Sequence, residues 1–369
     1  MRKIKYPIDL DKLEQMEMPP MRTITADCIL APELGAQQGG ELIAMGDLVA
    51  FPTETVYGLG ASGLNGDAVK HIFEVKGRPN DNPLILHVGN MRQVERLWTE
   101  IPHVARVLMN TFWPGPLTLV YHSSALVPEE VTAGLKTVAL RMPDNPVALA
   151  LIREAGVPIA APSANLSGRP SPTTAYHVWE DLNGKIPLIL NGGPCKYGVE
   201  STVLSLVDTP TILRPGAITK EMLEAVIGPV ELADCLLQPM KEGEKAMSPG
   251  MKYKHYAPKA QVYVVTGKPK MTSTRILERY AQLTAEGKKV RIAGTKQTMK
   301  MYREQGVEAA LMGDRKDPVT LCANLFSLLR DMDKEGVEVI LAEGVAPEGA
   351  GLAYMNRLLR AAGFEVEEV

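Results

Sequence analysis

Cysteine is scarce in this sequence, and long apolar runs are missing. The 369 residues contain four cysteines, at positions 28, 195, 235 and 322, and none of them form a C-x-x-C pair. This spacing fits neither a zinc site nor a disulfide framework, so a reducing cytoplasm is predicted. No run reaches the ~18 apolar residues of a membrane span, and the first residues lack the apolar core of a signal peptide. We therefore expect a soluble, cytoplasmic protein that does not contact membranes.

Several motifs of common enzymes are absent as well. The sequence has no Walker A, H-E-x-x-H or G-x-S-x-G motif, and its six histidines show no metal-ligand spacing. No protein-bound structural metal is therefore expected. The net charge of −3 argues against a general binder of nucleic acids, although a local basic cleft is compatible with an acidic total.

Length and composition indicate two domains of α/β type. With 369 residues and 45% hydrophobic residues, the chain is long for one core. We expect a polar leader over residues 1–22, a catalytic domain over 23–237, a Pro/Gly-containing charged linker over 238–259, and a smaller domain over 260–369. In the last part, strand-like and helical runs alternate, which favours a Rossmann-like parallel sheet. No comparable cluster of polar residues is expected at its strand ends.

The first domain is organised around the stretch from Phe51 to Val88. A short strand ends at Pro52, and a polar turn rich in Thr and Glu leads to Gly58 and Gly60, where the backbone can be approached closely. The next helix is expected to be capped by Asp67 and to stop at Gly77. Further along, one amphipathic helix is predicted over residues 94–110.

Two cations and three glycines in this stretch allow more than one interpretation. Lys76 and Arg78 can simply complement a helix dipole, yet the polar turn before them and the Asn-rich loop after them favour an anion site. Gly58, Gly60 and Gly63 match G-x-G-x-x-G, but the preceding strand is interrupted and no acidic residue follows at a strand end. A dinucleotide-binding dehydrogenase is therefore not favoured.

Hydroxyl and anion-binding residues recur where strands are expected to end. They are Thr53, Lys76, Arg78, Arg141, Ser163, Asn165, Ser201 and Arg214. In α/β folds such ends face the ligand crevice. Together these residues predict a cleft for a small molecule rich in phosphate or carboxylate, which acts by positioning and charge stabilisation.

Seven motifs occur in a fixed order: FPTETVYGLG, KGRPNDNPL, WPGPLTL, VALRMP, IAAPSANLSGRPSPT, GVESTV and ILRPG. In this order they closely resemble the threonylcarbamoyl-AMP synthase family, and SPGMKYKHYAP with NRLLRAAG resembles its long form. The resemblance implies a YrdC-like catalytic domain with a twisted mixed sheet. It also implies a nucleotidyltransferase that converts L-threonine, bicarbonate or CO2, and ATP to threonylcarbamoyl-AMP and pyrophosphate, for threonylcarbamoyladenosine modification of tRNA.

The resemblance also implies roles for individual residues. The catalytic set is Lys76, Arg78, Ser163 and Asn165; the threonine set is Thr53, His87, Arg141 and Ser201; the ATP set is Lys76, Thr137, Ser163, Asn165, Ser171, Arg214 and Tyr256. Mg2+ is expected with ATP, and the linker is expected to close over the nucleotide. The product is expected to pass to tRNA-modifying transferase proteins. The alternative is an RNA-binding module that uses the same basic cleft, and tRNA binding by the enzyme is expected to be weak.

Overall fold

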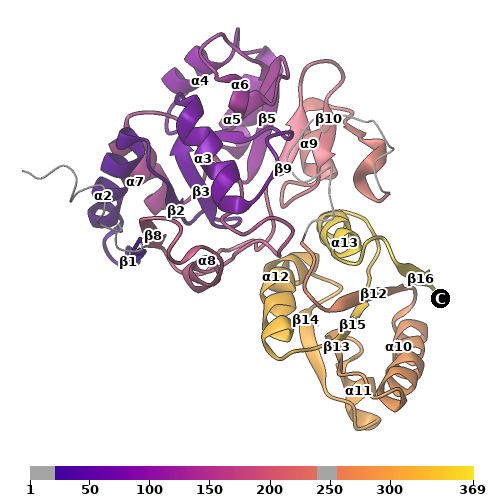
Figure 1. The fold of residues 1–369 in the computed structure, drawn as a ribbon. Helices are drawn as coiled ribbons and strands as arrows, with labels where there is room; N and C mark the ends of the chain where they lie inside the picture. Colours follow the sequence, from indigo (N-terminus) through magenta and orange to yellow (C-terminus); the bar gives the residue numbers. More distant parts are fainter. Residues whose placement is uncertain (1–20, 239–255) are drawn as a thin grey trace, which may run out of the picture.

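The computed structural model describes residues 21–238 and 256–369 as two α/β domains (Figure 1). Each domain is built around its own sheet, one of eleven strands and one of five. The predicted fold class is therefore confirmed. Most of the predicted leader and linker, residues 1–20 and 239–255, lies outside the described residues.

The sheet of the first domain mixes parallel and antiparallel neighbours in the order β1-β8-β2-β3-β7-β4-β6-β5-β9-β10-β11. Its strands are β1 (Ile24–Asp27), β2 (Val49–Phe51), β3 (Gly58–Ser62), β4 (Ile85–His87), β5 (Leu117–His122), β6 (Thr137–Arg141), β7 (Ile159–Ala161), β8 (Leu188–Asn191), β9 (Thr202–Ser205), β10 (Thr211–Arg214) and β11 (Glu231–Leu232). Strands distant in the sequence thus become neighbours, and this brings separate motifs together.

The helices of the first domain are α2 (Pro32–Met45), α3 (Gly66–Lys76), α4 (Met91–Leu97), α5 (His103–Phe112), α6 (Glu129–Thr132), α7 (Pro146–Ala155), α8 (Ala175–Leu182) and α9 (Lys220–Ile227), followed by the 3-10 helix η1 (Asp234–Leu236). Both faces of β2 are buried. Because side chains alternate along a strand, Val49 and Phe51 pack with α2 and α7, whereas Ala50 joins the main core with α3.

Three local predictions in the first domain are wrong. The predicted turn at Gly58 and Gly60 is strand β3, in which Gly60 leaves room for the Phe51 ring; a Cβ there would lie 2.9 Å from that ring. Helix α3 is capped by Asn65, whose side chain accepts hydrogen bonds from two backbone amides, and not by Asp67. The helix predicted over 94–110 is two helices, α4 and α5, because the chain turns between them at Pro102.

The second domain has an all-parallel sheet in the order β14-β13-β15-β12-β16. Its elements are β12 (Gln261–Thr266), α10 (Pro269–Ala285), β13 (Val290–Thr295), α11 (Met299–Glu304), β14 (Ala309–Gly313), α12 (Pro318–Lys334), β15 (Val339–Glu343), α13 (Ala350–Ala361) and β16 (Val366–Glu368). Helices α12 and α13 lie between this sheet and the first domain, and α10 and α11 cover the other face (Figure 1).

The carboxyl ends of these strands do carry a polar cluster, so that prediction is also wrong. Glu343 at the end of β15 accepts hydrogen bonds from Thr295 (2.7 Å), Tyr302 (2.6 Å) and Thr298, and Arg315 donates to it at 3.2 Å. The carboxylate is fully buried, with donors on each of its oxygens.

None of the helices in the two described segments combines the length and the apolar character needed to cross a membrane.

Candidate active site

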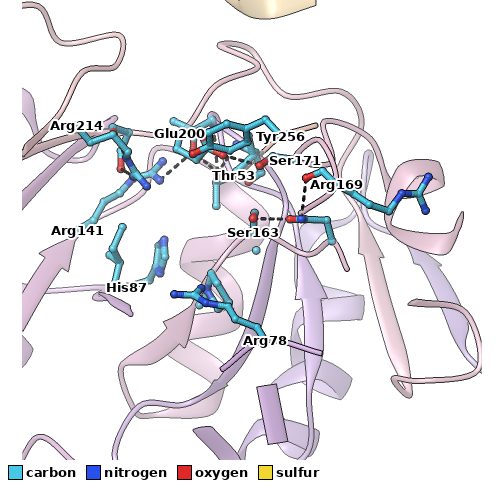
Figure 2. Close-up of a pocket in the computed structure, with 18 residues that line it drawn as sticks. Thr53, Arg78, His87, Arg141, Ser163, Arg169, Ser171, Glu200, Arg214 and Tyr256 are labelled. Atoms are coloured by element: carbon cyan, nitrogen blue, oxygen red, sulfur yellow. Dashed lines mark hydrogen bonds between the residues drawn. The ribbon is translucent and has the colours of Figure 1, made fainter. Parts of the chain in front are cut away.

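A pocket in the first domain collects most of the residues that the sequence singles out (Figure 2). It is lined by ten of them: Thr53, Arg78, His87, Arg141, Ser163, Asn165, Ser171, Ser201, Arg214 and Tyr256. Two predicted residues, Lys76 and Thr137, do not line it. The roles assigned to all twelve remain predictions, but the fold brings ten of them to one place.

Strand register explains why these side chains converge. His87 is the cross-strand partner of Arg141 in the parallel pair β4 and β6. Because side chains alternate, Ile85 and His87 share one face of β4, and both line the pocket. We call the sheet face that carries His87 and Arg141 the ligand face.

Arg141 is held by three groups in a buried position. Its Nη1 donates to Thr55 Oγ1 at 2.9 Å and its Nε to the Gly115 carbonyl at 3.3 Å. Its Nη2 lies 2.6 Å from a carboxylate oxygen of Glu54, and both side chains are only 4% exposed. Glu54 belongs to the polar turn that the sequence indicated, but the sequence assigned it no role, since its partner lies far along the chain.

Arg214 and Ser201 form a second unit on the ligand face. Arg214 donates from Nε to the Ser201 carbonyl at 3.0 Å and from Nη2 to the Ser201 hydroxyl at 3.1 Å. The same hydroxyl lies 2.8 Å from Thr118 Oγ1. Burial lowers the pKa of Arg214 to about 10, so its guanidinium stays charged at neutral pH.

Lys76 does not line the pocket, but it binds a loop that does. Its ammonium donates to the backbone carbonyls of Ser163 and Asn165, at 2.5 Å each, and the side chain is buried. Burial, with the nearby charge of Arg78, lowers the pKa of Lys76 well below its usual value. These contacts make Lys76 a residue that shapes the 163–165 loop.

The loop itself is fixed by side chains that the sequence predicted as catalytic. The Ser163 hydroxyl donates to Asn165 Oδ1 at 2.5 Å, and the Asn165 amide donates to the carbonyls of Leu166 (2.8 Å) and Arg169 (3.0 Å). Arg169 lines the pocket, but its guanidinium is directed away and pairs with Asp181 (Figure 2).

His87 is present as the neutral imidazole. Burial, reinforced by the charge of Arg141, lowers its pKa to about 3. Its Nδ1 has no hydrogen-bond partner within the described chain. A neutral ring that lines the pocket can contact a substrate hydroxyl or amine.

The second domain reaches the pocket through Arg357 of α13, which binds Glu200 of the first domain, a residue that the sequence did not single out. Glu200 lines the pocket and accepts a hydrogen bond from Ser171 at 2.5 Å and one from Arg357 of α13 at 2.8 Å. Although burial alone would raise the pKa of Glu200, the charges of Arg357 and Arg214 keep it below its usual value. Arg357, fully buried, also donates to the Pro215 carbonyl at 2.9 Å.

Tyr256 joins the two domains at the pocket. It lines the pocket while its ring stacks on Phe326 of α12, with ring centroids 5.0 Å apart. Its backbone has a positive φ of 64°, which is uncommon for a tyrosine. Tyr256 falls within the predicted linker, so the described end of that segment forms part of the pocket wall.

Thr137 lies on the ligand face, at the other end of β6 from Arg141. Residues 137, 139 and 141 share that face, and Thr137 lines a second pocket with Thr211. Between the two pockets lies one apolar cluster. It consists of Ile85, Val120, Ala139, Val203 and Leu213, of which Ile85 lines the first pocket and Val120 and Leu213 the second. An apolar strip with polar ends therefore runs along the sheet.

Comparisons with known proteins agree with this geometry. The family model described as telomere recombination matches residues 41–216, and that described as threonylcarbamoyl-AMP synthase, C-terminal domain, matches residues 218–363. Threonylcarbamoyl-AMP synthase of Bacillus subtilis is 50% identical over 332 residues, which cover 89% of this chain and 93% of the relative. Threonylcarbamoyl-AMP synthase of Pyrococcus abyssi is 50% identical over 328 residues, which cover 89% of this chain and 94% of the relative.

The chain belongs to the threonylcarbamoyl-AMP synthase family.

Solved structures support the same assignment. The structure of P. abyssi Sua5 complexed with L-threonine is 47% identical, with a TM-score of 0.87 over 94% of this chain and 100% of that one. A form of the same protein that carries two alanine substitutions is 46% identical, with a TM-score of 0.88 and coverage of 94% and 98%. The predicted family and the predicted nucleotidyltransferase class are confirmed, and with them the predicted function at the level of the family.

Proposed function

We propose that this protein makes threonylcarbamoyl-AMP from L-threonine, ATP and bicarbonate or CO2. The amine of threonine takes up CO2 to give a carbamate, and a carbamate oxygen attacks the α-phosphorus of ATP. The bond to the β-phosphate oxygen breaks, and pyrophosphate leaves. The observation that carries the proposal is one shared pocket. It is lined by Arg141 and His87, which are partners across β6 and β4, and by Arg214 with its hydrogen-bonded neighbour Ser201.

The amino acid fits the Arg141 side of the pocket. A guanidinium fixed by Thr55 and Gly115 presents a planar fork that suits the α-carboxylate. The neutral ring of His87, paired in register with Arg141, then lies within the same subsite for the amine or hydroxyl. Thr53 and Ser201 line the same cavity and complete the proposed threonine set.

The nucleotide fits along the ligand face. Its phosphates would lie near Arg78, Arg214 and the 163–165 loop, where charge develops as pyrophosphate departs. The apolar strip between the two pockets suits the flat face of a base, and Thr137 at its far end suits a polar edge. This path supports the proposed ATP-binding role of Thr137, although that residue is absent from the first pocket.

The described residues form no site at which the protein itself would hold the expected Mg2+. No group of three or more His, Cys, Asp or Glu in this part of the chain could hold a metal ion. The two carboxylates at the pocket, Glu54 and Glu200, are paired with Arg141 and Arg357. These residues do not fit a resident metal, so no step is assigned to it; Mg2+ would enter bound to the triphosphate.

The direct test is pyrophosphate release from ATP in the presence of bicarbonate. L-Threonine, L-serine and no amino acid are compared. We expect release that depends on threonine, with serine a weaker substrate because one methyl group is worth ~1–3 kcal/mol in a pocket. Release at the level of the blank with all three would contradict the proposal.

A second test addresses the nucleotide path. Val203→Phe fills the apolar strip without touching the proposed threonine contacts, because Val203 belongs to the strip and does not line the first pocket. We expect a higher KM for ATP and an unchanged Kd for L-threonine measured without ATP. A raised Kd for threonine with an unchanged KM for ATP would overturn the path.

The use of the product is a proposal from the family resemblance, and the RNA alternative is one from the cations of the cleft. A mixed anhydride such as threonylcarbamoyl-AMP is consumed by transfer of its acyl group, here to tRNA by transferase proteins. No observation in the described residues favours an RNA-binding module, because Arg141 and Arg214 are buried in the pocket, where a polynucleotide backbone does not reach them. Binding of tRNA that falls with salt, without ATP turnover, would favour that alternative.

A further inference from the structure

Glu54 is a buried carboxylate that the proposed mechanism does not use. It lies in the Thr-Glu-Thr turn after β2, between two residues that line the pocket, and it is 5% exposed. Its one ion-pair contact within residues 21–238 and 256–369 is with Arg141 Nη2, at 2.6 Å. Neither of its oxygens has a well-aligned hydrogen-bond donor in that part of the chain.

This arrangement is costly unless it serves the arginine. An ionised carboxylate can accept about four hydrogen bonds, and leaving them unmade in a buried site costs free energy. A carboxylate that only stabilised the fold would be expected to gather donors, as Glu343 does with Thr295, Tyr302 and Arg315. Glu54 instead faces one guanidinium, so its main electrostatic effect falls on Arg141.

The other guanidiniums of the pocket are held in other ways. Arg78 donates to the Asn82 carbonyl at 3.1 Å, and Arg214 donates to the carbonyl and hydroxyl of Ser201 and interacts with the charge of Glu200. Glu200 also pairs with Arg357, whereas the carboxylate of Glu54 has its ion-pair contact with Arg141, at 2.6 Å. The pair of Glu54 and Arg141 is therefore electrically neutral as a unit.

The substrates also differ in charge. Amino acids bind as zwitterions with no net charge, whereas ATP and bicarbonate are anions, as is the product pyrophosphate. A buried guanidinium without a counter-ion would attract any of these anions, since an uncompensated charge in a poorly solvated site is strongly unfavourable. A guanidinium that already has a counter-ion attracts an anion much less, yet still offers its remaining N–H groups to a carboxylate.

We propose that Glu54 is a specificity-determining residue: it neutralises Arg141 so that this subsite accepts the zwitterionic amino acid and rejects phosphate and bicarbonate anions. This inference rests on the proposed function, because it takes Arg141 as the contact for the amino acid carboxylate. Glu54 acts through Arg141 and is a positioning residue.

The test is binding of L-threonine to the full-length protein, measured by calorimetry with and without an excess of inorganic phosphate. In the wild type, phosphate leaves the Kd for threonine unchanged. In Glu54→Gln, which keeps the shape and removes the charge, phosphate competes and raises that Kd about tenfold, equivalent to ~1.4 kcal/mol. Glu54→Asp keeps the charge and restores the insensitivity to phosphate. Glu130→Gln, at the ion pair with Lys70 outside the pocket, behaves as the wild type.

Two results would overturn the inference. One is competition by phosphate in the wild type. This measurement needs no variant, so it can overturn the inference even if Glu54→Gln does not fold. The other is a folded Glu54→Gln whose affinity for threonine ignores phosphate. Failure of the proposed function gives a different pattern, in which the wild type neither binds threonine nor releases pyrophosphate with it.

Discussion

The two sheets of this protein both end in polar clusters, and the clusters differ in how their charges are satisfied. In the second domain, Glu343 receives donors on both oxygens, and Arg315 also donates to the Gly344 carbonyl at 2.9 Å. In the first domain, the oxygens of Glu54 and Nδ1 of His87 have no hydrogen-bond donor or acceptor in the described chain.

This difference separates a structural cluster from a binding site. A saturated, fully buried network stabilises the fold and has nothing left to offer a ligand. Buried groups beside a pocket that lack partners are unfavourable in the free protein, and such a cost is expected where the groups set the charge or the shape of a binding site. Polar residues at strand ends therefore do not by themselves indicate function; their unused hydrogen-bonding capacity does.

The largest effect is expected where the two domains meet. Arg357→Met removes the bonds to Glu200 and leaves that carboxylate buried without its main partner. We expect the free energy of unfolding to fall by about 3–5 kcal/mol, measured by urea denaturation. Because Glu200 also holds Ser171, kcat/KM should fall as well.

The matched control in the same domain is Arg275→Met, whose partners Glu278 and Glu367 lie on the surface. It should leave kcat/KM unchanged. Equal loss of activity in both variants would mean that the second domain affects the pocket only through overall stability.

Lys76→Ala should have the next largest effect. Without its ammonium, the carbonyls of Ser163 and Asn165 lose their shared donor, and the loop that faces the phosphates loses its shape. We expect kcat/KM to fall by ~10² to 10³, as for the removal of one well-placed donor, in a pyrophosphate-release assay. Lys70→Ala, on the same helix but exposed, is the control and should keep full activity. Near-wild-type turnover of Lys76→Ala at saturating substrates would refute this role.

The saturated cluster around Glu343 provides the opposite prediction. Glu343→Gln replaces one acceptor oxygen with an amide donor, which faces either Thr295 or Tyr302 because these two bind different oxygens. The free energy of unfolding should fall by ~1–3 kcal/mol. Steady-state kinetics with threonine and ATP should not change, because no residue of this cluster lines the pocket. A changed KM with unchanged stability would show that the cluster is a second site.

The smallest effect at neutral pH concerns His87, and it grows only as the pH falls. The pKa of His87 is about 3 in the folded protein and about 6.5 when the chain is unfolded, so the unfolded state takes up a proton first as pH falls. The wild type should therefore lose stability relative to His87→Asn by about 1.4 kcal/mol per pH unit between pH 6.5 and 3. Above pH 6.5 the difference should be constant. Thermal or urea unfolding at several pH values checks this, and a parallel pH dependence of both proteins would contradict it.

Much of the fold was accessible from the sequence. The pattern of the sequence predicts a strand over 138–141 and a helix over 318–332, and β6 and α12 match these bounds to within two residues, because hydrophobic periodicity reports local geometry. It failed at β3, where Gly58 and Gly60 suggested a turn although their role is to leave room for Phe51 and Ala161 across the sheet. These positions require glycine because of the side chains packed against them, some of which are remote in the sequence.

The site was accessible in part, for the same reason. Cations and hydroxyls at strand ends, such as Arg141 and Ser201, could be selected from their positions alone. Glu54 and Glu200 could not, since the meaning of each depends on an arginine that is distant in the sequence. Thr137 shows the same limit in another way: alternation along β6 places it on the face of Arg141, but only the fold shows that it lines the second pocket and not the first.

By itself the sequence determined the two α/β domains, the family and the types of side chain available for an anion-binding reaction. The tertiary structure alone decided which of those side chains are paired, which are sealed and which face a pocket. The physical reason is that hydrophobic patterning acts locally along the chain, whereas the energy of a buried charge is set by whichever groups folding places within a few ångströms of it.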